Sequence, residues 1–173
     1  MSVNHNFLPL SDAELSSLVE NPESAHVLVE DRRNEVQTIF TMGVAITALI
    51  AEDEDDPLAF LECGGPEGEC GWVGEYDEGN EDRGATCQVD MGYGPASYYK
   101  NSFLLSIAEA ISRIAVADFA SRFNADWLEV NHVYPGQWHN ESSREFLVEC
   151  FITLRNCVIE AARNGHHLLV WCD

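Results

Sequence analysis

The sequence predicts an α+β fold: one domain over residues 1–173, with a small mixed or antiparallel sheet packed against several helices. Two neighbouring segments carry this prediction. Between residues 144 and 163, apolar side chains recur at steps of three and four, which is typical of an amphipathic helix with about 3.6 residues per turn. Gly165 suits the position after a helix, where φ is usually positive. Residues 166–172 are rich in Leu, Val and Trp, which favours a buried strand. We therefore expect a long C-terminal helix followed by a terminal strand.

A shorter helix is expected at residues 11–20. Ser11 and Glu14 have the spacing of a capping box, in which a hydroxyl and a carboxylate satisfy backbone amides of the first turn. The sequence Asn21-Pro22 ends this helix, because the residue before a proline disfavours helical backbone. The apolar positions expected to be buried are Leu15, Leu18 and Val19.

The next segments are less decisive. Residues 24–30 suit either a helical turn or a short strand. Residues 33–51 have apolar spacing that favours a helix, although the β-branched residues from 44 to 50 favour some strand character. We expect a short strand at residues 57–61, a turn at 64–66 and a possible strand at 71–74.

Helices dominate the second half of the expected fold. Asn101 or Ser102 can cap a helix that carries apolar residues as far as Ile111. Residues 116–123 form a further helical piece, which would bury Phe119 and Phe123. Residues 124–126 are typical of a turn and a possible helix cap.

The charge of the chain is unusual. Thirty acidic residues face nine basic ones, for a net charge of −21. Such a field repels nucleic acid and anionic membranes and speeds encounter with cationic partners. The plainer interpretation is that the charge only keeps the protein soluble. No apolar run approaches the roughly 20 residues that cross a bilayer, and residues 1–10 lack the basic and apolar regions of a signal peptide. We expect a cytoplasmic protein with no membrane or nucleic-acid partner.

The six cysteines do not indicate a metal site. Cys150 and Cys157 lie on the apolar face of the long helix and are most simply core residues. Cys63 and Cys70 are too far apart for the close cysteine pair of common zinc sites. We expect no metal and no cofactor, although the sequence does not decide whether Cys63, Cys70 and Cys87 pair or bind metal.

An acidic, loop-rich segment at residues 52–90 is the first candidate interface. Its acidic residues face a single basic one, Arg83, and a long loop inside a compact domain is usually functional or disordered. A solvated insertion is the plainer alternative. Loop-borne carboxylates with aromatic neighbours favour a non-enzymatic binding protein, such as an immunity-type inhibitor that neutralises a cationic bacterial toxin or effector, for example a nuclease. The predicted contact residues are Glu52, Asp53, Glu54, Asp55, Asp56, Trp72, Glu75, Tyr76, Asp77, Glu78, Glu81 and Asp82.

A small-molecule site or an enzyme is the second interpretation. Gly92 and Gly94 flank Tyr93, and such glycines either bring backbone amides close to a ligand or form a tight corner. A cleft could lie between this corner and residues 134–138. We find no sequence motif that assigns a catalytic residue. The residues expected to line the cleft are Tyr93, Tyr98, Tyr134, Trp138 and His139. His166 and His167 follow the long helix, where capping of its carbonyl groups is the simpler role than ligand binding.

An ordered series of motifs resembles the YfbM-like family of small bacterial proteins of unknown function. The series comprises Gly92-Tyr-Gly-Pro-Ala-Ser-Tyr-Tyr99, Phe123-Asn, Val133-Tyr-Pro-Gly-Gln-Trp138 and the helix ending Ala161-Ala-Arg-Asn-Gly165. The resemblance extends from Pro57 to the C-terminus. It departs from the family in the helix before Pro57, where Phe40 and Met42 stand without the family's tryptophan. The resemblance implies an α+β fold and no particular reaction.

Overall fold

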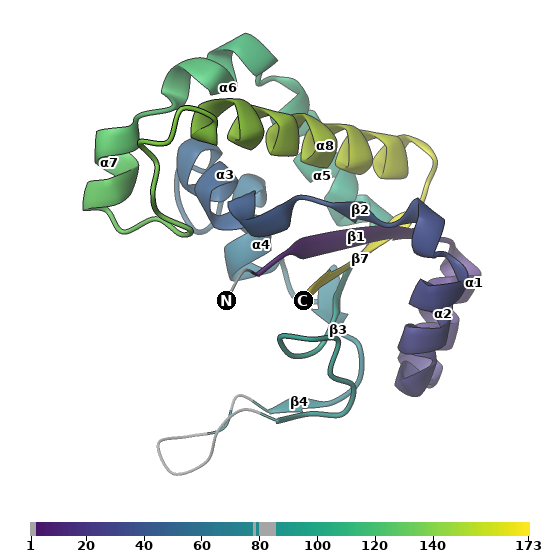
Figure 1. Ribbon diagram of the computed structural model, residues 1–173. Coiled ribbons are helices and arrows are strands. Elements are labelled where there is room, and N and C mark those ends of the chain that lie inside the picture. The colour runs from purple at the N-terminus through teal and green to yellow at the C-terminus, as the bar shows by residue number, and fades with distance from the viewer. Residues whose placement is uncertain (1–2, 78, 80–85) are drawn as a thin grey trace.

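An antiparallel sheet runs through the centre of the protein (Figure 1). The computed structural model describes residues 3–77, 79 and 86–173. Within these residues the sheet has the strand order β2-β1-β7-β6-β3, and every adjacent pair is antiparallel. A separate hairpin pairs β4 with β5. The strands are β1 (His5–Leu10), β2 (Gln37–Thr38), β3 (Cys70–Trp72), β4 (Tyr76–Asp77), β5 (Thr86–Cys87), β6 (Ser97–Tyr99) and β7 (His167–Cys172).

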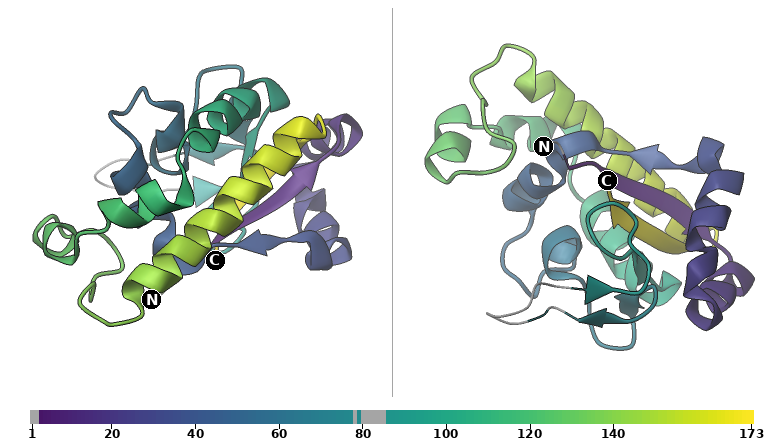
Figure 2. Two further views of the ribbon diagram at one scale, coloured as in Figure 1. Left: turned by 90° about the horizontal axis from the view of Figure 1, so that it is seen from above. Right: turned by 60° about the horizontal axis from the view of Figure 1, so that its bottom comes forward.

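The sheet is covered on both faces, and β7 shows how. Leu168 and Val170 point into one core and Leu169 and Trp171 into the other, because successive side chains of a strand alternate between faces. The larger core lies under α3 (Gly43–Ile50), α5 (Asn101–Ser112), α6 (Val116–Arg122) and α8 (Ser143–Arg163), and the smaller lies against α1 (Asp12–Glu20) and α2 (Ala25–Asp31). Figure 2 shows α8 running across the sheet. The predicted α+β class is confirmed.

The C-terminal unit has the predicted form. Helix α8 ends at Arg163, Gly165 has φ of 73°, and β7 follows. The predicted cap of α5 is different, since the Asn101 side chain donates to the carbonyl oxygens of Ala162 (3.1 Å) and His166 (3.0 Å). The backbone amide of Asn101 instead donates to His167 Nδ1 at 3.1 Å. Asn101 therefore ties the start of α5 to the end of α8.

Helix α1 has the predicted capping box, in which Ser11 and Glu14 exchange hydrogen bonds. Leu15 and Leu18 are buried, whereas Val19 is 53% exposed, so its predicted burial is wrong. Val19 follows Leu18 directly, and adjacent positions of a helix face different directions. Residues 24–30, for which the sequence left helix and strand open, mostly belong to α2.

The continuous helix expected at residues 33–51 is interrupted. The segment consists of a 3-10 turn at Arg33–Glu35, strand β2, a 3-10 turn at Phe40–Met42 and helix α3. Backbone pairing with β1 decides this outcome: Ile39 donates its amide to the His5 carbonyl oxygen at 3.0 Å and is completely buried. Tertiary pairing thus overrides the local helical pattern.

The strand expected at residues 57–61 is wrong. Pro57–Ala59 forms a 3-10 turn and Phe60–Cys63 forms α4. The Asp56 carboxylate accepts the amide of Leu58 at 2.8 Å, and Pro57 occupies the first position of the turn, where its missing N–H costs nothing. A short apolar run does not by itself distinguish a strand from a buried helix.

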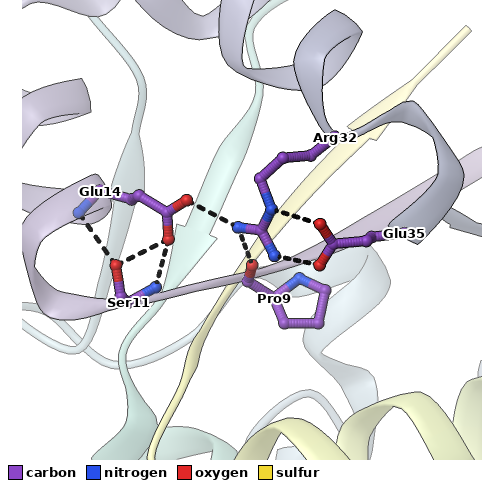
Figure 3. Close-up of polar contacts among 5 residues, drawn as sticks. All are labelled: Pro9, Ser11, Glu14, Arg32 and Glu35. Atoms are coloured by element: carbon purple, nitrogen blue, oxygen red, sulfur yellow. Dashed lines mark hydrogen bonds and ion pairs between the residues drawn. The ribbon is translucent and has the colours of Figure 1, made fainter.

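A network centred on Arg32 joins α1 and α2 to the edge of β1 (Figure 3). Its guanidinium contacts both carboxylate oxygens of Glu35 (3.0 and 2.6 Å), Glu14 (2.9 Å) and the Pro9 carbonyl oxygen (2.8 Å). Hydrogen bonds from Arg32 hold the pKa of Glu35 below its ordinary value. Partial burial acts to raise the pKa of Glu14, but hydrogen bonds from Ser11 and the charge of Arg32 outweigh it, and the net shift is downward.

Replacing Arg32 by methionine is expected to lower the free energy of unfolding by about 1–2 kcal/mol near neutral pH. Since the folded-state pKa of both carboxyls is depressed, their contribution is complete above the ordinary glutamate pKa of 4.5 and is lost as the pH falls through the folded values. The cost of Arg32→Met should therefore shrink in acid. Urea unfolding of both proteins across this range measures it, and a cost independent of pH would contradict the assignment. Arg33→Met, at the exposed neighbouring arginine, is the matched control.

Candidate functional site

A cavity of about 370 Å³ opens at the end of β7. Four strands of the sheet supply its floor, the β4–β5 hairpin and residues 90–95 supply walls, and Leu61 of α4 closes one side. Its volume lies within the usual range of small-ligand pockets. The described residues that line it are His5, Leu61, Trp72, Tyr76, Thr86, Cys87, Asp90, Tyr93, Gly94, Pro95, Ser97, Tyr99, Val170, Trp171 and Cys172.

Strand register assembles the floor. Trp72 lies opposite Ser97, and Ser97 lies opposite Val170, so the three side chains share one face of neighbouring strands. His5 of β1 lies opposite Cys172 of β7 and adds to the same floor. Residues far apart in the sequence thus meet because antiparallel pairing aligns them.

Exposed aromatic rings form the mouth. Trp72 and Tyr93 are 49% and 48% exposed although both line the cavity. The rings of Trp72 and Tyr76 lie 4.9 Å apart between centroids, tilted by 54°. Tyr99 is buried deeper and donates its hydroxyl to the Phe60 carbonyl oxygen at 2.8 Å. The cavity therefore offers ring faces to an incoming group, while the polar atom of its innermost tyrosine is already paired.

Asp90 is held in place by the loop that follows it. Its Oδ1 accepts the backbone amides of Gly92 (2.9 Å) and Gly94 (3.1 Å), and these two hydrogen bonds lower the pKa of the carboxyl. Gly92 has φ of 132°, and a Cβ at this position would come within 2.9 Å of Asp173. Tyr93 also donates its amide to the Cys172 carbonyl oxygen at 2.9 Å. The carboxylate is thereby fixed in its ionised form at the cavity wall.

His5 lies on the cavity floor and is only 8% exposed. Its Nδ1 is buried without a hydrogen-bond partner among the described residues. Burial lowers the pKa of the imidazole, so the ring is neutral near pH 7. Gly43 of α3 makes room for it, because a Cβ there would lie 2.5 Å from two ring atoms.

The residues predicted to line a cleft are not brought together. Tyr93 lines the cavity, but Trp138 is 1% exposed and donates its indole N–H to the Val133 carbonyl oxygen at 2.9 Å. Tyr134 accepts the Val3 amide through its hydroxyl oxygen at 3.3 Å, and His139 pairs with Asp126 at 3.4 Å. Tyr98 packs against the smaller core. The predicted cleft is thus replaced by a cavity on one side of the Gly92–Tyr99 corner.

The predicted acidic contact residues fall into two places. Glu52 and Asp56 line a different cavity beside α5, together with Arg113 and Arg122. Asp56 also accepts the amides of Glu52 and Leu58, which is a local structural role. The remaining acidic side chains of that run, Asp53, Glu54 and Asp55, are exposed.

The second group surrounds the aromatic cavity. Trp72 and Tyr76 line it, and the neighbouring Glu75 and Asp77 are exposed. Asp77 accepts the Gly79 amide at 2.8 Å. The predicted residues Glu78, Glu81 and Asp82 lie outside the described residues. Of the two groups, only this one combines carboxylates with exposed aromatic rings.

Burial favours the protonated form of three of the described thiols. Burial raises the pKa of Cys150 to about 11 and of Cys157 to about 12, and it also raises the pKa of Cys172. A protonated thiol is a weak nucleophile. Within residues 3–77, 79 and 86–173, no three His, Cys, Asp or Glu side chains are grouped to hold a metal ion. The side chain of Cys63 lies outside the described part of the chain.

A family model described as "Domain of unknown function (DUF1877)" matches residues 1–171. The chain belongs to this family. Its fold is similar to the crystal structure of a protein of unknown function, YfbM from Escherichia coli, with a TM-score of 0.62 at 14% sequence identity over 98% of this chain and 99% of that one. The resemblance found in the sequence is thus confirmed. A search among curated proteins gives no match.

These similarities identify the fold of this DUF1877 domain. Fold alone does not imply function, so the activity depends on the residues of the site. In the part of the chain that the structure describes, no helix is both long and apolar enough to span a bilayer. Sequence reasoning missed His5, Asp90, Cys87 and Cys172 as cavity residues. The only local signal was Asp90 two and four residues before glycines, a spacing typical of an Asx-type turn.

Proposed function

We propose that this protein is a non-enzymatic, acidic binding protein of the immunity type, which neutralises a cationic bacterial toxin or effector by protein–protein contact. The observation that carries the proposal is an aromatic cavity beside exposed carboxylates on a chain of net charge −21. Aromatic anchors in concave sites commonly dominate protein interfaces, and opposite charge speeds association and selects the partner.

The surroundings of the cavity support a cationic partner. No lysine or arginine is among the described residues that line it, whereas Asp90 is, and Glu75 and Asp77 lie beside Tyr76. Cys70, Cys87, Cys150, Cys157 and Cys172 are free thiols. Free thiols are typical of a reducing compartment, which supports a cytoplasmic location as part of the proposal.

The test is recovery and reconstitution of the partner. Tagged protein should capture a basic protein from its native host, and the purified pair should bind again with an affinity that falls steeply with added salt. We expect the combined variant Glu75→Gln with Asp90→Asn to weaken this binding by about tenfold or more. The matched control, Glu54→Gln with Asp55→Asn, removes the same charge from the other acidic group and should have a smaller effect.

Two outcomes would overturn the proposal. One is that no basic protein retained from the lysate binds again when purified. The other is that the purified pair binds equally well with both sets of substitutions at low and high salt. Thermal unfolding of each variant shows whether a loss of binding reflects the interface rather than the fold.

A small-molecule-binding protein is the second candidate function. The volume of the cavity and the presence of Asp90 and Ser97 among its aromatic and apolar lining residues favour it, because ligand pockets combine apolar walls with a few polar groups. It predicts that a low-molecular-weight compound protects the protein against thermal unfolding without any protein partner.

A further inference from the structure

We infer that the cavity at the end of β7 receives an arginine side chain of the basic partner, with the guanidinium stacked on Trp72 and Tyr93 and paired with Asp90. This inference rests on the proposed function and adds the chemical group that the partner inserts. It follows from the ring faces, the fixed carboxylate and the neutral floor of the cavity.

Asp90 selects a positively charged group for the cavity. Two backbone amides occupy its Oδ1, whereas its Oδ2 has no partner among the described residues. Asp90 is exposed at the wall of the cavity, and an ionised carboxylate oxygen there favours a cationic donor. Among the described residues that line the cavity there is no lysine or arginine to pair with it, and the charge interaction of Asp90 with His26 is a smaller contribution than its backbone hydrogen bonds.

The aromatic mouth favours guanidinium over ammonium. Trp72 and Tyr93 each leave about half of their surface open beside the cavity, with Tyr76 tilted against Trp72. A cation is attracted to the face of an aromatic ring. An arginine side chain should bind these rings more strongly than a lysine side chain, because its planar and weakly hydrated guanidinium can stack on a ring while its N–H groups still reach a carboxylate.

The floor completes the match. The buried His5 ring is uncharged, so it does not repel a cation. Val170, which shares one face of the sheet with Trp72 and Ser97, supplies an apolar surface for the methylene stem of the inserted side chain. A long side chain with an apolar stem and a flat cationic head therefore fits a cavity that has an apolar floor, aromatic rings and the Asp90 carboxylate.

The experiment uses three capped tripeptides with arginine, lysine or citrulline between glycines, titrated into the full-length protein at low salt. The indole N–H resonance of Trp72, assigned with the Trp72→Phe variant, reports binding. We expect a saturable shift with the arginine peptide, about tenfold weaker binding of the lysine peptide and no saturable shift with the uncharged citrulline peptide.

Asp90→Asn is the decisive variant. Its amide oxygen can still accept the amides of Gly92 and Gly94, so the loop is kept while the charge is removed. We expect Asp90→Asn to weaken binding of the arginine peptide by about tenfold. We expect Trp72→Ala to abolish the binding. Because this variant lacks the Trp72 indole, its titration is followed through the resonances of Tyr93. The controls are Asp126→Asn and Trp127→Ala, at an exposed carboxylate and an exposed indole of helix α7 (Ala125–Val130).

Equal binding of the arginine and citrulline peptides, or an unchanged affinity in Asp90→Asn, would overturn the inference. If the purified basic partner binds with an affinity that falls as salt is added, but the arginine peptide gives no shift at Trp72, the inference fails and the proposed function stands. If the arginine peptide binds as expected but no basic partner binds again when purified, the proposed function fails and the guanidinium site stands.

Discussion

Replacing Trp138 by alanine is expected to lower the free energy of unfolding by about 3–5 kcal/mol. The side chain is 1% exposed, its ring lies 6.3 Å from that of Phe123 between centroids, and its indole N–H is bonded to the Val133 carbonyl oxygen. Alanine would leave a large cavity and remove one of the two hydrogen bonds that the Val133 carbonyl oxygen accepts, the other coming from the Gly136 amide at 3.1 Å. Urea unfolding followed by far-UV circular dichroism measures the loss without relying on tryptophan fluorescence.

Two further variants separate the contribution of the buried ring from that of its hydrogen bond and from the loss of an exposed indole. Trp138→Phe keeps most of the ring volume but loses the hydrogen bond, and should cost about 1–2 kcal/mol. Trp127→Ala removes an indole that is 43% exposed on α7, and its cost should stay below about 1 kcal/mol. A small loss for Trp138→Ala would contradict the core assignment and return Trp138 to the ligand-binding candidates.

Replacing Gly43 by valine is expected to destabilise the protein by about 3 kcal/mol. A Cβ at this position meets Cε1 and Nδ1 of His5 at 2.5 Å, and the His5 ring is itself enclosed. Because His5 also lines the cavity at the end of β7, displacement of its ring is expected to change the cavity floor and to weaken binding of the arginine peptide. Chemical unfolding and the peptide titration measure the two effects separately.

The cause of this loss can be isolated with a double-mutant cycle. If the collision with the imidazole is responsible, Gly43→Val should cost about 1 kcal/mol or less in a His5→Ala background, where the ring is gone. Equal costs in both backgrounds would locate the strain elsewhere in α3. Ala48→Val, at a half-buried position of the same helix, is a control for introducing a β-branched residue into α3.

Local physics made some elements predictable from the sequence. The periodicity of residues 144–163, the positive φ at Gly165 and the capping box of Ser11 each depend on neighbours within about one helical turn. The predicted strand at residues 71–74 is present as β3, and the expected helix at 116–123 is present as α6. These features needed no knowledge of distant residues.

Elements that depend on distant partners were missed or mistaken. No strand is predicted from the sequence at β1, which contains Pro9, a residue that argues against a strand interior. In the structure β2 pairs with β1 only at Asn6 and Phe7. Pro9 therefore has no β2 residue opposite it, and its missing N–H breaks no hydrogen bond on that side of the strand. The pairing of β1 with β7 over its full length then holds the segment in the sheet.

The candidate site divides in the same way. The sequence alone determined the acidic charge, the aromatic residues Trp72, Tyr76 and Tyr93, and the long helix with its terminal strand. Only the tertiary structure decided that Trp138 belongs to the core, and that His5 and Asp90 join the aromatic rings around one cavity. The reason is that His5 and Cys172 are neighbours through strand pairing, and contacts between residues so far apart in the chain leave no periodic trace in the sequence.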